Sequence, residues 1–544
     1  MEPEPIAPLQ ESPAPPGPSV TVVVIGYEDA AHVADAVRSA LAQGPEVREV
    51  LAVDDCSTDG SGALLDGLAA HDPRLTVVHR ATNSGGCGTP RNDGIDRASS
   101  SYVMFLDSDD VLPPGAVRAL LDAAVRHDAQ VAAGLCVRRE LPSGRETPWQ
   151  PELYAKASVV AHPTRRPRLV HDTLCVNKLY RVDFLREHGI RFPDGRFVYE
   201  DFVFTARVLA AAPRVALVPD RVYVWHVRRA AERLSLSLDR SGIDNWQARL
   251  DAHRLAVDTL LAASQKRLAR AARAHFLDHS LRMYARELDL RGPEYTAEWW
   301  RRTRAYLETF DTADFEAAPA PGRVVGRLVL ASPAPRDLPR VKEVAARPAR
   351  LCPPYARTPD GTPAWSADLP QVPLDHLLHR PVGLLPLAVD GELRPGARGT
   401  RLRLLLHELY GRVADAGPRS VDVEVVDRQR GTVTQRRTAA FSALPEDDDL
   451  WSATALLDLS ALGRAGTWDI RLRLRFADGS LRETTAHAVR RPGLLRRVAV
   501  PSRRHGVLLA QPYATHSGAL ALRTASGLRG VASVVRRRAA RLLH

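Results

Sequence analysis

Short apolar runs alternate with amphipathic segments over roughly the first quarter of the chain. Val33, Val37, Ala40 and Leu41 recur at helical spacing and predict a helix over residues 30–43. We expect further helices at 61–68 and after the turn NSGGCG. Four runs rich in β-branched residues predict strands: VTVVVIGY (20–27), REVLAVDD (48–55), LTVVHR (75–80) and YVMFLDSDD (102–110). Strands that alternate with helices predict a parallel α/β sheet.

The pattern changes twice farther along the chain. Beyond residue 240 the sequence is arginine-rich and helical, and beyond residue 376 it alternates with period two between turn signals, which predicts an antiparallel β-sandwich. Between them, RVVGRLVL (323–330) looks like a strand among prolines and glycines. We divide the chain into a disordered Pro-rich lead (1–19), an α/β domain (20–237), a helical extension (238–316), a partly folded Pro/Gly-rich linker (317–375), a β-sandwich (376–512) and a basic C-terminal tail (513–544).

Composition narrows the class of protein and its surroundings. The 544 residues carry a formal net charge of +11, mostly from arginine, which favours acidic partners such as a phosphate-rich substrate or anionic lipid. Codon bias is an equal explanation for the arginines. The five cysteines are odd in number and form no CxxC, which favours a reduced intracellular setting. No apolar run is long enough for a membrane-spanning helix, and the lead has no apolar core of a signal peptide.

Polar side chains gather where the predicted strands end. Ligands of parallel α/β sheets bind outside the carboxyl ends of the strands. Those ends carry Tyr27, Asp54, Asp55, Asp107, Asp109 and Asp110. Clustered carboxylates repel one another unless a cation offsets them, and Mg²⁺ or Mn²⁺ prefers oxygen ligands of this kind. The alternative is that one aspartate caps the next helix while the others are solvated.

The order and spacing of several motifs resemble a known family. VTVVVIGYEDAAHVADAVRSALAQ, VDDCSTDGSG, NSGGCGTPRNDGI and FLDSDD resemble family 2 glycosyltransferases of the GT-A fold. CVNKLYR, RFPDGRFVYEDFVF and YVWHVRRAAERLSLS are similar to the branch that builds or glycosylates teichoic acids and capsular polysaccharides. The resemblance covers residues 20 to about 237. It implies a GT-A domain, and the later segments resemble the helical linkers and immunoglobulin-like β domains of that branch.

The resemblance also implies an inverting transfer of a sugar from a nucleotide diphosphate donor. Asp201, paired with Glu200, matches the family's catalytic base; the alternative is that the pair only caps a helix start. The residues that match donor-binding positions are Tyr27, Glu28, Asp54, Asp55, Asn83, Gly85, Arg91, Asn92, Asp107, Ser108 and Arg229. The expected ligands of Mg²⁺ or Mn²⁺ are Asp109, Asp107, Asp110 and His226, with a satisfied structural histidine as the alternative for His226.

Some positions depart from the family pattern. Ile25 and Glu28 stand where proline and asparagine are usual, Cys56 replaces a usual glycine, and Arg91 follows Pro90 where many relatives have alanine. These departures leave the identity of the nucleobase and of the sugar in the donor undetermined, but they remove no catalytic carboxylate.

We therefore expect a cytoplasmic hexosyl- or N-acetylhexosaminyltransferase, which could lie at the inner face of the plasma membrane through its basic tail. It would move a sugar from a UDP-type donor to a hydroxyl of a teichoic-acid-like or capsular polymer, or its precursor. The C-terminal region could form a homo-oligomer. One alternative is a processive capsule or exopolysaccharide polymerase, and another is a non-catalytic carbohydrate-binding scaffold. No recognisable module supports nucleic-acid binding.

Overall fold

The chain forms two compact units, Met1–Ala272 and Arg273–His544, whose boundary falls within one helix. A computed structural model describes residues 17–228, 239–396, 399–444, 447–462, 465–489, 498–502 and 506–526. Most of the predicted lead and the last eighteen residues of the predicted tail thus lie outside the described residues.

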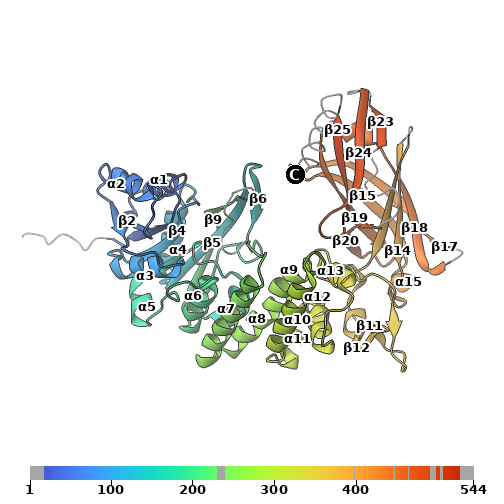
Figure 1. Cartoon of the computed structure of the whole chain (residues 1–544), viewed down its shortest axis with the longest axis horizontal. Coiled ribbons are helices and arrows are strands. Elements are labelled where there is room, and N and C mark those ends of the chain that lie inside the picture. Colours follow the sequence, from blue (N-terminus) through green and yellow to red (C-terminus); the bar gives the residue numbers. More distant parts are fainter. Residues whose placement is uncertain are drawn as a thin grey trace, which may run out of the picture. The chain divides into compact units, whose positions relative to one another are not determined.

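The first unit is an α/β domain that runs into two long helices (Figure 1). Its strands are β1 (Val20–Gly26), β2 (Val47–Asp54), β3 (Leu75–His79), β4 (Tyr102–Asp107), β5 (Val131–Glu140), β6 (Arg145–Pro148), β7 (Ser158–Val160), β8 (Lys178–Arg181) and β9 (Val215–Val227). Its helices are α1 (Val33–Leu41), α2 (Ser61–Ala69), α3 (Gly88–Arg97), α4 (Ala116–Arg126), α5 (Val182–Glu187), α6 (Glu200–Ala210), α7 (Ile243–Ala262) and α8 (Lys266–Phe276), with single turns η1 (Pro163–Arg165) and η2 (Pro167–His171). The predicted elements of residues 20–107 are confirmed.

The strands form one nine-stranded mixed sheet. Its order is β3-β2-β1-β4-β8-β5-β9-β7, with β6 paired to β5. The first four strands are parallel, as predicted, whereas β8 runs antiparallel between β4 and β5. In the parallel register Gly26 pairs with Asp54, and Ile25 pairs with Asp107. The polar ends of β1, β2 and β4 therefore meet at one edge.

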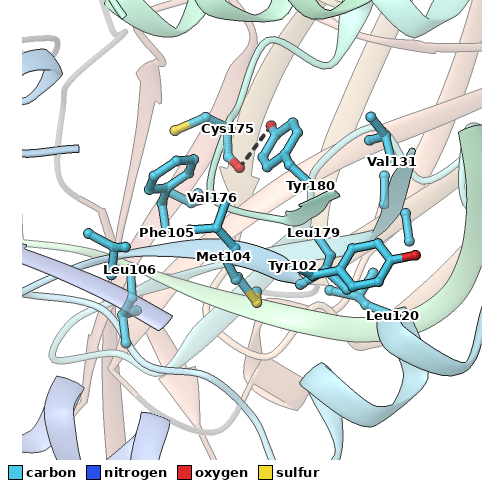
Figure 2. Packing of buried hydrophobic residues seen from close by; sticks show 14 of the residues in the cluster. Tyr102, Met104, Phe105, Leu106, Leu120, Val131, Cys175, Val176, Leu179 and Tyr180 are labelled. Atoms are coloured by element: carbon cyan, nitrogen blue, oxygen red, sulfur yellow. Dashed lines mark hydrogen bonds between the residues drawn. The ribbon is translucent and has the colours of Figure 1, made fainter. Parts of the chain in front are cut away.

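Strand β4 lies at the centre of the core. Both its faces are covered, and Met104, Phe105 and Leu106 are fully buried, which explains why the strand reads as a continuous apolar run rather than an alternating one. Figure 2 shows these side chains beside Leu179 and Tyr180 of β8. The Tyr180 hydroxyl donates to the carbonyl of Cys175 at 3.1 Å, so the buried phenol keeps a partner.

The second unit joins helices to a small three-stranded sheet, β10-β11-β12, and to two larger sheets that are antiparallel except for the parallel pair of β13 and β21. Its helical elements are η3 (Leu277–Leu281), α9 (Arg282–Ala285), η4 (Leu288–Leu290), α10 (Pro293–Leu307), α11 (Thr312–Ala317), α12 (Ala320–Ala331), α13 (Leu338–Ala345), α14 (Asp375–Leu378), η5 (Val382–Leu384), α15 (Arg412–Ala416) and η6 (Leu459–Leu462). Its strands are β10 (Ala356–Arg357), β11 (Pro363–Ser366), β12 (Leu369–Pro373), β13 (Val389–Gly396), β14 (Gly399–His407), β15 (Pro418–Asp427), β16 (Val433–Ala440), β17 (Ser442–Leu444), β18 (Asp447–Leu457), β19 (Gly466–Phe476), β20 (Leu481–Thr485), β21 (His487–Ala488), β23 (Val498–Ser502), β24 (Gly506–Ala514) and β25 (Leu520–Ser526).

The C-terminal strands form the layered arrangement that the period-two pattern predicts. One sheet has the order β17-β18-β14-β13-β21, and the other has β16-β15-β19-β25-β24-β23 with β20 paired to β19. Strand β16 packs against β18 of the facing sheet. Strands β24 and β25 continue past residue 512, where we placed the end of this domain.

The strand predicted from RVVGRLVL is wrong, because these residues lie in α12. Val324, Val325, Leu328 and Val329 are buried at helical spacing. A Cβ at Gly322 would lie 2.7 Å from the carbonyl oxygen of Leu277, so the glycine permits a close approach of backbone to helix. Within the described ranges, no helix is both long and apolar enough to cross a membrane.

Candidate active site

A single buried arginine joins three of the predicted carboxylates. Arg91 of α3, only 2% exposed, donates through Nη2 to Asp107 Oδ1 at 2.7 Å. Its Nη1 donates to Glu200 Oε1 at 2.6 Å and to Asp201 Oδ1 at 3.2 Å. The arginine thus links the end of β4 to the start of α6, two elements that the sequence separates by more than ninety residues.

An aromatic stack supports this arginine. The Arg91 guanidinium lies 5.3 Å from the ring centre of Phe192, which stacks on Phe204 at 3.8 Å with an interplanar angle of 3°. Because Phe204 follows Glu200 by four residues in α6, both lie on one face of that helix. The helix therefore places its carboxylate and its supporting ring on the same side.

The loop after β4 is held by strand β9. The Tyr223 hydroxyl accepts from the backbone N–H of Asp107 at 3.2 Å and donates to Asp110 Oδ2 at 2.8 Å. Asp110 Oδ1 accepts from the backbone N–H of His226 at 2.7 Å. Both oxygens of Asp110 therefore have protein donors, and this residue fixes the loop in place.

Asp109 is more open than Asp110. Its side chain is 45% exposed, and Oδ2 accepts from Arg228 Nη1 at 3.2 Å. Its carbonyl oxygen accepts from Arg228 at 2.9 Å and lies 3.0 Å from His226 Nδ1. A carbonyl only accepts, so His226 Nδ1 carries the proton and Nε2 keeps the lone pair. Burial lowers the pKa of His226, which favours this neutral form.

Three carboxyl groups of the site, those of Asp109, Glu200 and Asp201, have raised pKa values. Burial, followed by the charge of Asp107, raises the pKa of Asp109 to about 6. Burial, followed by the charge of Asp201, raises the pKa of Glu200 to about 7, although Arg91 opposes this. Burial also raises the pKa of Asp201. Raised carboxyl pKa values around one shared cation are typical of functional sites.

The residues after β2 organise a neighbouring loop. Asp55 accepts from Asn83 Nδ2 at 3.1 Å and from Ser84 Oγ at 2.7 Å, and it pairs with Arg80 Nε at 2.9 Å. The N–H of Gly85 donates to Asn83 Oδ1 at 2.9 Å. Asp55 thus ties down the loop that contains Asn83 and Gly85.

Asp54 occupies a different environment from Asp55. It is 4% exposed, accepts from the backbone N–H of Ser57 at 3.3 Å and lies 3.4 Å from His79 Nδ1. Tyr27, at the end of β1, is 41% exposed. The structure therefore brings Tyr27 and both aspartates to the predicted edge of the sheet.

Three other residues that were predicted to contact the nucleotide-sugar donor form hydrogen bonds within the protein. Glu28 Oε1 accepts from the backbone N–H of Thr58 at 2.6 Å, and Ser108 Oγ donates to Asp29 Oδ2 at 2.7 Å. Asn92 Nδ2 donates to the carbonyl of Phe192 at 3.0 Å. These contacts support the walls of the site. Arg229 lies outside the described residues.

Sequence reasoning missed several residues that shape the site. Tyr223 lies inside an apolar strand, so no local pattern distinguishes its hydroxyl. Asp29 and Arg80 lie at or just after the ends of predicted strands. That position is the feature of the sequence that could have identified them as site residues. Asp29 contributes to the negative potential that raises the pKa of Asp109.

Oxygen donors of the kind that suit a hard divalent cation follow β4, at Asp107 and Asp109. The predicted ligands do not converge further: among the described residues, no three of Asp107, Asp109, Asp110 and His226 bring ligand atoms within 4.8 Å of one another. Mg²⁺ and Mn²⁺ prefer such oxygens and are often shared with substrate phosphates.

Comparison with known proteins agrees with this architecture. The family model for glycosyl transferase family 2 matches residues 21–189. The succinoglycan biosynthesis protein ExoO of Rhizobium meliloti (strain 1021) is 32% identical over 267 residues, which are 47% of this chain and 74% of ExoO. The poly(ribitol-phosphate) β-N-acetylglucosaminyltransferase TarS of Staphylococcus aureus (strain MW2) is 30% identical over 40% of this chain and 36% of TarS.

Solved structures of S. aureus TarS share the fold. One matches 93% of this chain and 85% of its own, with a TM-score of 0.53 and 17% identity. A structure of TarS 1–349 in complex with UDP-GlcNAc matches 65% of this chain and 98% of its own, with a TM-score of 0.50 and 20% identity. The first unit is accordingly a GT-A glycosyltransferase domain. The chain belongs to glycosyltransferase family 2.

Proposed function

We propose that this glycosyltransferase inverts the anomeric carbon as it moves a sugar from a UDP-type donor to a hydroxyl of a phosphate-rich cell-surface polymer or its precursor. The observation that carries the proposal is the Arg91 bridge between Asp107 and the Glu200–Asp201 pair. It places the residues expected to hold the diphosphate beside those expected to take the acceptor proton.

Asp201 acts as the general base. Its side chain is 22% exposed, against 13% for Glu200, so it is the more open of the two carboxylates. The acceptor oxygen forms a bond to the anomeric carbon, the bond from that carbon to the diphosphate breaks, and the hydroxyl proton passes to Asp201. Glu200 shares the negative charge through Arg91 and keeps Asp201 oriented.

Asp107 and Asp109 would hold Mg²⁺ or Mn²⁺ together with the diphosphate oxygens, and His226 Nε2 would join them as a ligand only if it moved closer. When bound, this cation supplies positive charge to the departing diphosphate. Asp110 positions the loop through Tyr223 and the backbone of His226. Asp54 and Asp55 lie at the neighbouring strand end, with Tyr27 beside them, and form the nucleoside side of the donor site.

The acceptor class follows from charge and from the relatives. The net charge of +11 favours a polyanion, and TarS is named for transfer to poly(ribitol-phosphate). UDP-GlcNAc, the ligand of a TarS structure, is the first donor to test. We place the enzyme in the cytoplasm, against the inner membrane face, with the second unit binding polymer or further copies of the chain.

Calorimetric titration of UDP, with and without Mn²⁺, tests the donor site. We expect binding that needs the metal and that Asp109→Ala abolishes. Asp35→Ala is the matched control, because Asp35 is 75% exposed on α1 and pairs only weakly with Arg38. Metal-independent binding, or full binding by Asp109→Ala, would contradict the assignment.

A transfer assay with UDP-GlcNAc and a poly(polyol phosphate) acceptor tests the base. Asp201→Asn should keep donor affinity and lower kcat by about 10²- to 10⁴-fold. An unchanged kcat would overturn the role of Asp201. A protein that binds no nucleotide and transfers no sugar would point instead to a carbohydrate-binding scaffold.

A processive polymerase is the second candidate, favoured by the similarity to ExoO, a succinoglycan biosynthesis protein. Product length separates the two. Long chains from one primer while most primer is unused indicate processive extension, whereas single additions spread over many acceptors indicate decoration.

A further inference from the structure

A group of metal-ligand side chains lies in the second unit, remote in sequence from the donor-site residues. Glu343 of α13, Cys352 and His487 of β21 each offer one ligand atom, and these three atoms lie within 4.8 Å of one another. Glu343 and Cys352 are buried, and the His487 side chain is 26% exposed. The group thus has one partly open side.

The histidine faces an acceptor on each side. His487 Nδ1 lies 2.9 Å from Asp390 Oδ1, and Nε2 lies 3.7 Å from Glu343 Oε1. Carboxylate oxygens only accept hydrogen bonds, and a neutral imidazole carries a single proton. With that proton on Nδ1, Nε2 and Glu343 Oε1 face each other as two acceptors, an arrangement that a metal ion or a second proton between them would stabilise.

The cysteine distinguishes a metal site from a simple imidazolium. Cys352 is 8% exposed and free of disulfides, and no hydrogen bond from its thiol is found in the described part of the chain. An ion pair between a protonated histidine and a glutamate needs no thiolate beside it. A zinc site uses one: thiolate, imidazole and carboxylate together form a mixed S, N, O ligand set typical of Zn²⁺.

The surrounding residues orient these ligands. Asp390 also receives a hydrogen bond from His407 Nε2 at 2.9 Å, so two rings fix one carboxylate. Arg350, 1% exposed on its side chain, donates from Nε to Glu343 Oε2 at 2.8 Å and leaves Oε1 toward the histidine. A carboxylate behind a ligating histidine is a recurrent feature of zinc sites, because it sets the tautomer and the ring orientation.

Charge and distance are compatible with a bound ion. Zn²⁺ and Arg350 together would balance the negative charges of Glu343, Asp390 and a Cys352 thiolate. Tetrahedral bonds of about 2.0–2.2 Å separate a nitrogen and an oxygen ligand by about 3.4 Å. The 3.7 Å between His487 Nε2 and Glu343 Oε1 is close to that value.

We propose that Glu343 Oε1, Cys352 Sγ and His487 Nε2 bind Zn²⁺, with water in the fourth position on the open side of His487. The ion links α13 to β21, and so fastens a helix of the second unit to the edge of a sheet. It contributes to the stability of this unit and takes no part in sugar transfer.

Co²⁺ is the probe, because a thiolate bound to it gives an intense near-ultraviolet charge-transfer band that oxygen ligands do not. Chelator-treated full-length protein should bind one Co²⁺ with this band, and Zn²⁺ should displace it. Cys352→Ser should lose the band, whereas Cys56→Ser, which changes a thiol of the first unit, should keep it. A band that persists in Cys352→Ser would overturn the proposal.

Two further measurements guard against a variant that merely misfolds. Zn²⁺ should raise the unfolding temperature of the intact protein, and Cys352→Ser should match the metal-free intact protein in the absence of Zn²⁺ but gain nothing from it. Asp390→Asn should weaken Zn²⁺ affinity by about 10- to 100-fold. An intact protein that shows neither the band nor a Zn²⁺-dependent shift contains an imidazolium–carboxylate pair only, and the proposal fails.

Discussion

The hydroxyl of Tyr223 donates a hydrogen bond to Asp110 Oδ2 at 2.8 Å, and both residues are almost fully buried. The same hydroxyl accepts from the backbone N–H of Asp107 at 3.2 Å. One side chain of β9 therefore holds the loop whose Asp107 and Asp109 form the proposed metal site. A tyrosine to which the sequence assigned no role thus holds the loop that carries the Asp107–Asp109 motif.

Tyr223→Phe should weaken both folding and donor binding. The change leaves a buried carboxylate oxygen without its donor, which costs about 1–3 kcal/mol in the free energy of unfolding. The loop loosens as well, and we expect metal-dependent UDP affinity to fall roughly tenfold, or about 1.4 kcal/mol. Urea denaturation and calorimetry measure the two effects.

Tyr154→Phe is the matched control. Tyr154 is equally buried in the same unit, and its hydroxyl bonds to Asp172 and Asn177 rather than to the site. It should lose stability without losing UDP affinity. Equal affinity losses in the two variants would show that the effect of Tyr223 is general destabilisation.

Arg91→Met should move the pH dependence of transfer. The acidic limb of kcat/KM reports deprotonation of the Glu200–Asp201 pair, and the pKa of Glu200 is about 7. Arg91 stabilises the ionised pair and lowers its pKa, so removal of the cation raises that pKa and shifts the limb to higher pH. At pH 7 a smaller fraction of the enzyme is then in its basic form.

Arg91→Lys is the comparison for this effect. Lysine keeps the positive charge but cannot donate to three carboxylates from one planar group. The acidic limb of kcat/KM for Arg91→Lys should lie between the limbs of Arg91→Met and of the unaltered protein. A limb that stays in place or moves to lower pH in Arg91→Met would contradict the role of Arg91.

The strand ends could be predicted from the sequence, whereas the contacts between residues far apart in the sequence could not. Parallel register follows from apolar strands that alternate with helices, and it brought Asp54 and Asp107 to one edge as expected. The Arg91–Glu200 contact joins residues 109 positions apart, and the antiparallel insertion of β8 lies between their elements in the sequence; no local periodicity encodes either.

The α12 segment shows a second limit of sequence patterns. Its β-branched residues favoured a strand, but burial at Val324, Val325, Leu328 and Val329 has helical spacing, and Gly322 allows close packing on Leu277. Tertiary packing overrode local propensity there. The Glu343–Cys352–His487 group was equally invisible, because His487 lies more than 130 positions from the other two residues in the sequence.

Asp55→Ala should release the loop that carries Asn83 and Ser84. The carboxylate is 4% exposed, and its loss removes one partner each from Asn83, Ser84 and Arg80. Hydrogen bonds to charged groups contribute about 1.5–3 kcal/mol each, so we expect an unfolding free energy lower by roughly 2–3 kcal/mol. UDP affinity should fall as well.

Asp72→Ala controls for the loss of an aspartate on the same unit. Asp72 lies before β3 and bonds chiefly to its near neighbour Arg74, with 24% of its side chain exposed. We expect little destabilisation, because a solvent-exposed ion pair contributes little to stability, and unchanged UDP binding. Equal UDP affinity for both variants and the unaltered protein would show that the loop is irrelevant to the donor.

Gly88→Ala should disrupt the contact between the start of α3 and the segment that precedes α6. A Cβ at residue 88 would lie 2.2 Å from the carbonyl oxygen of Pro193, and backbone cannot move aside as a flexible side chain can. Overpacking of this kind costs about 1–3 kcal/mol. Because Arg91 is one turn farther along α3, the shift should also lower kcat.

Gly67→Ala provides a control of opposite sign. Gly67 lies in α2 with nothing within 4 Å of its added Cβ and with ordinary helical backbone, so alanine should stabilise the protein by about 0.5–1 kcal/mol. Thermal unfolding and transfer rates of the two variants measure the contrast. If Gly88→Ala retained the stability and the kcat of the unaltered protein, the close approach of α3 to Pro193 would not be what holds Arg91 in place.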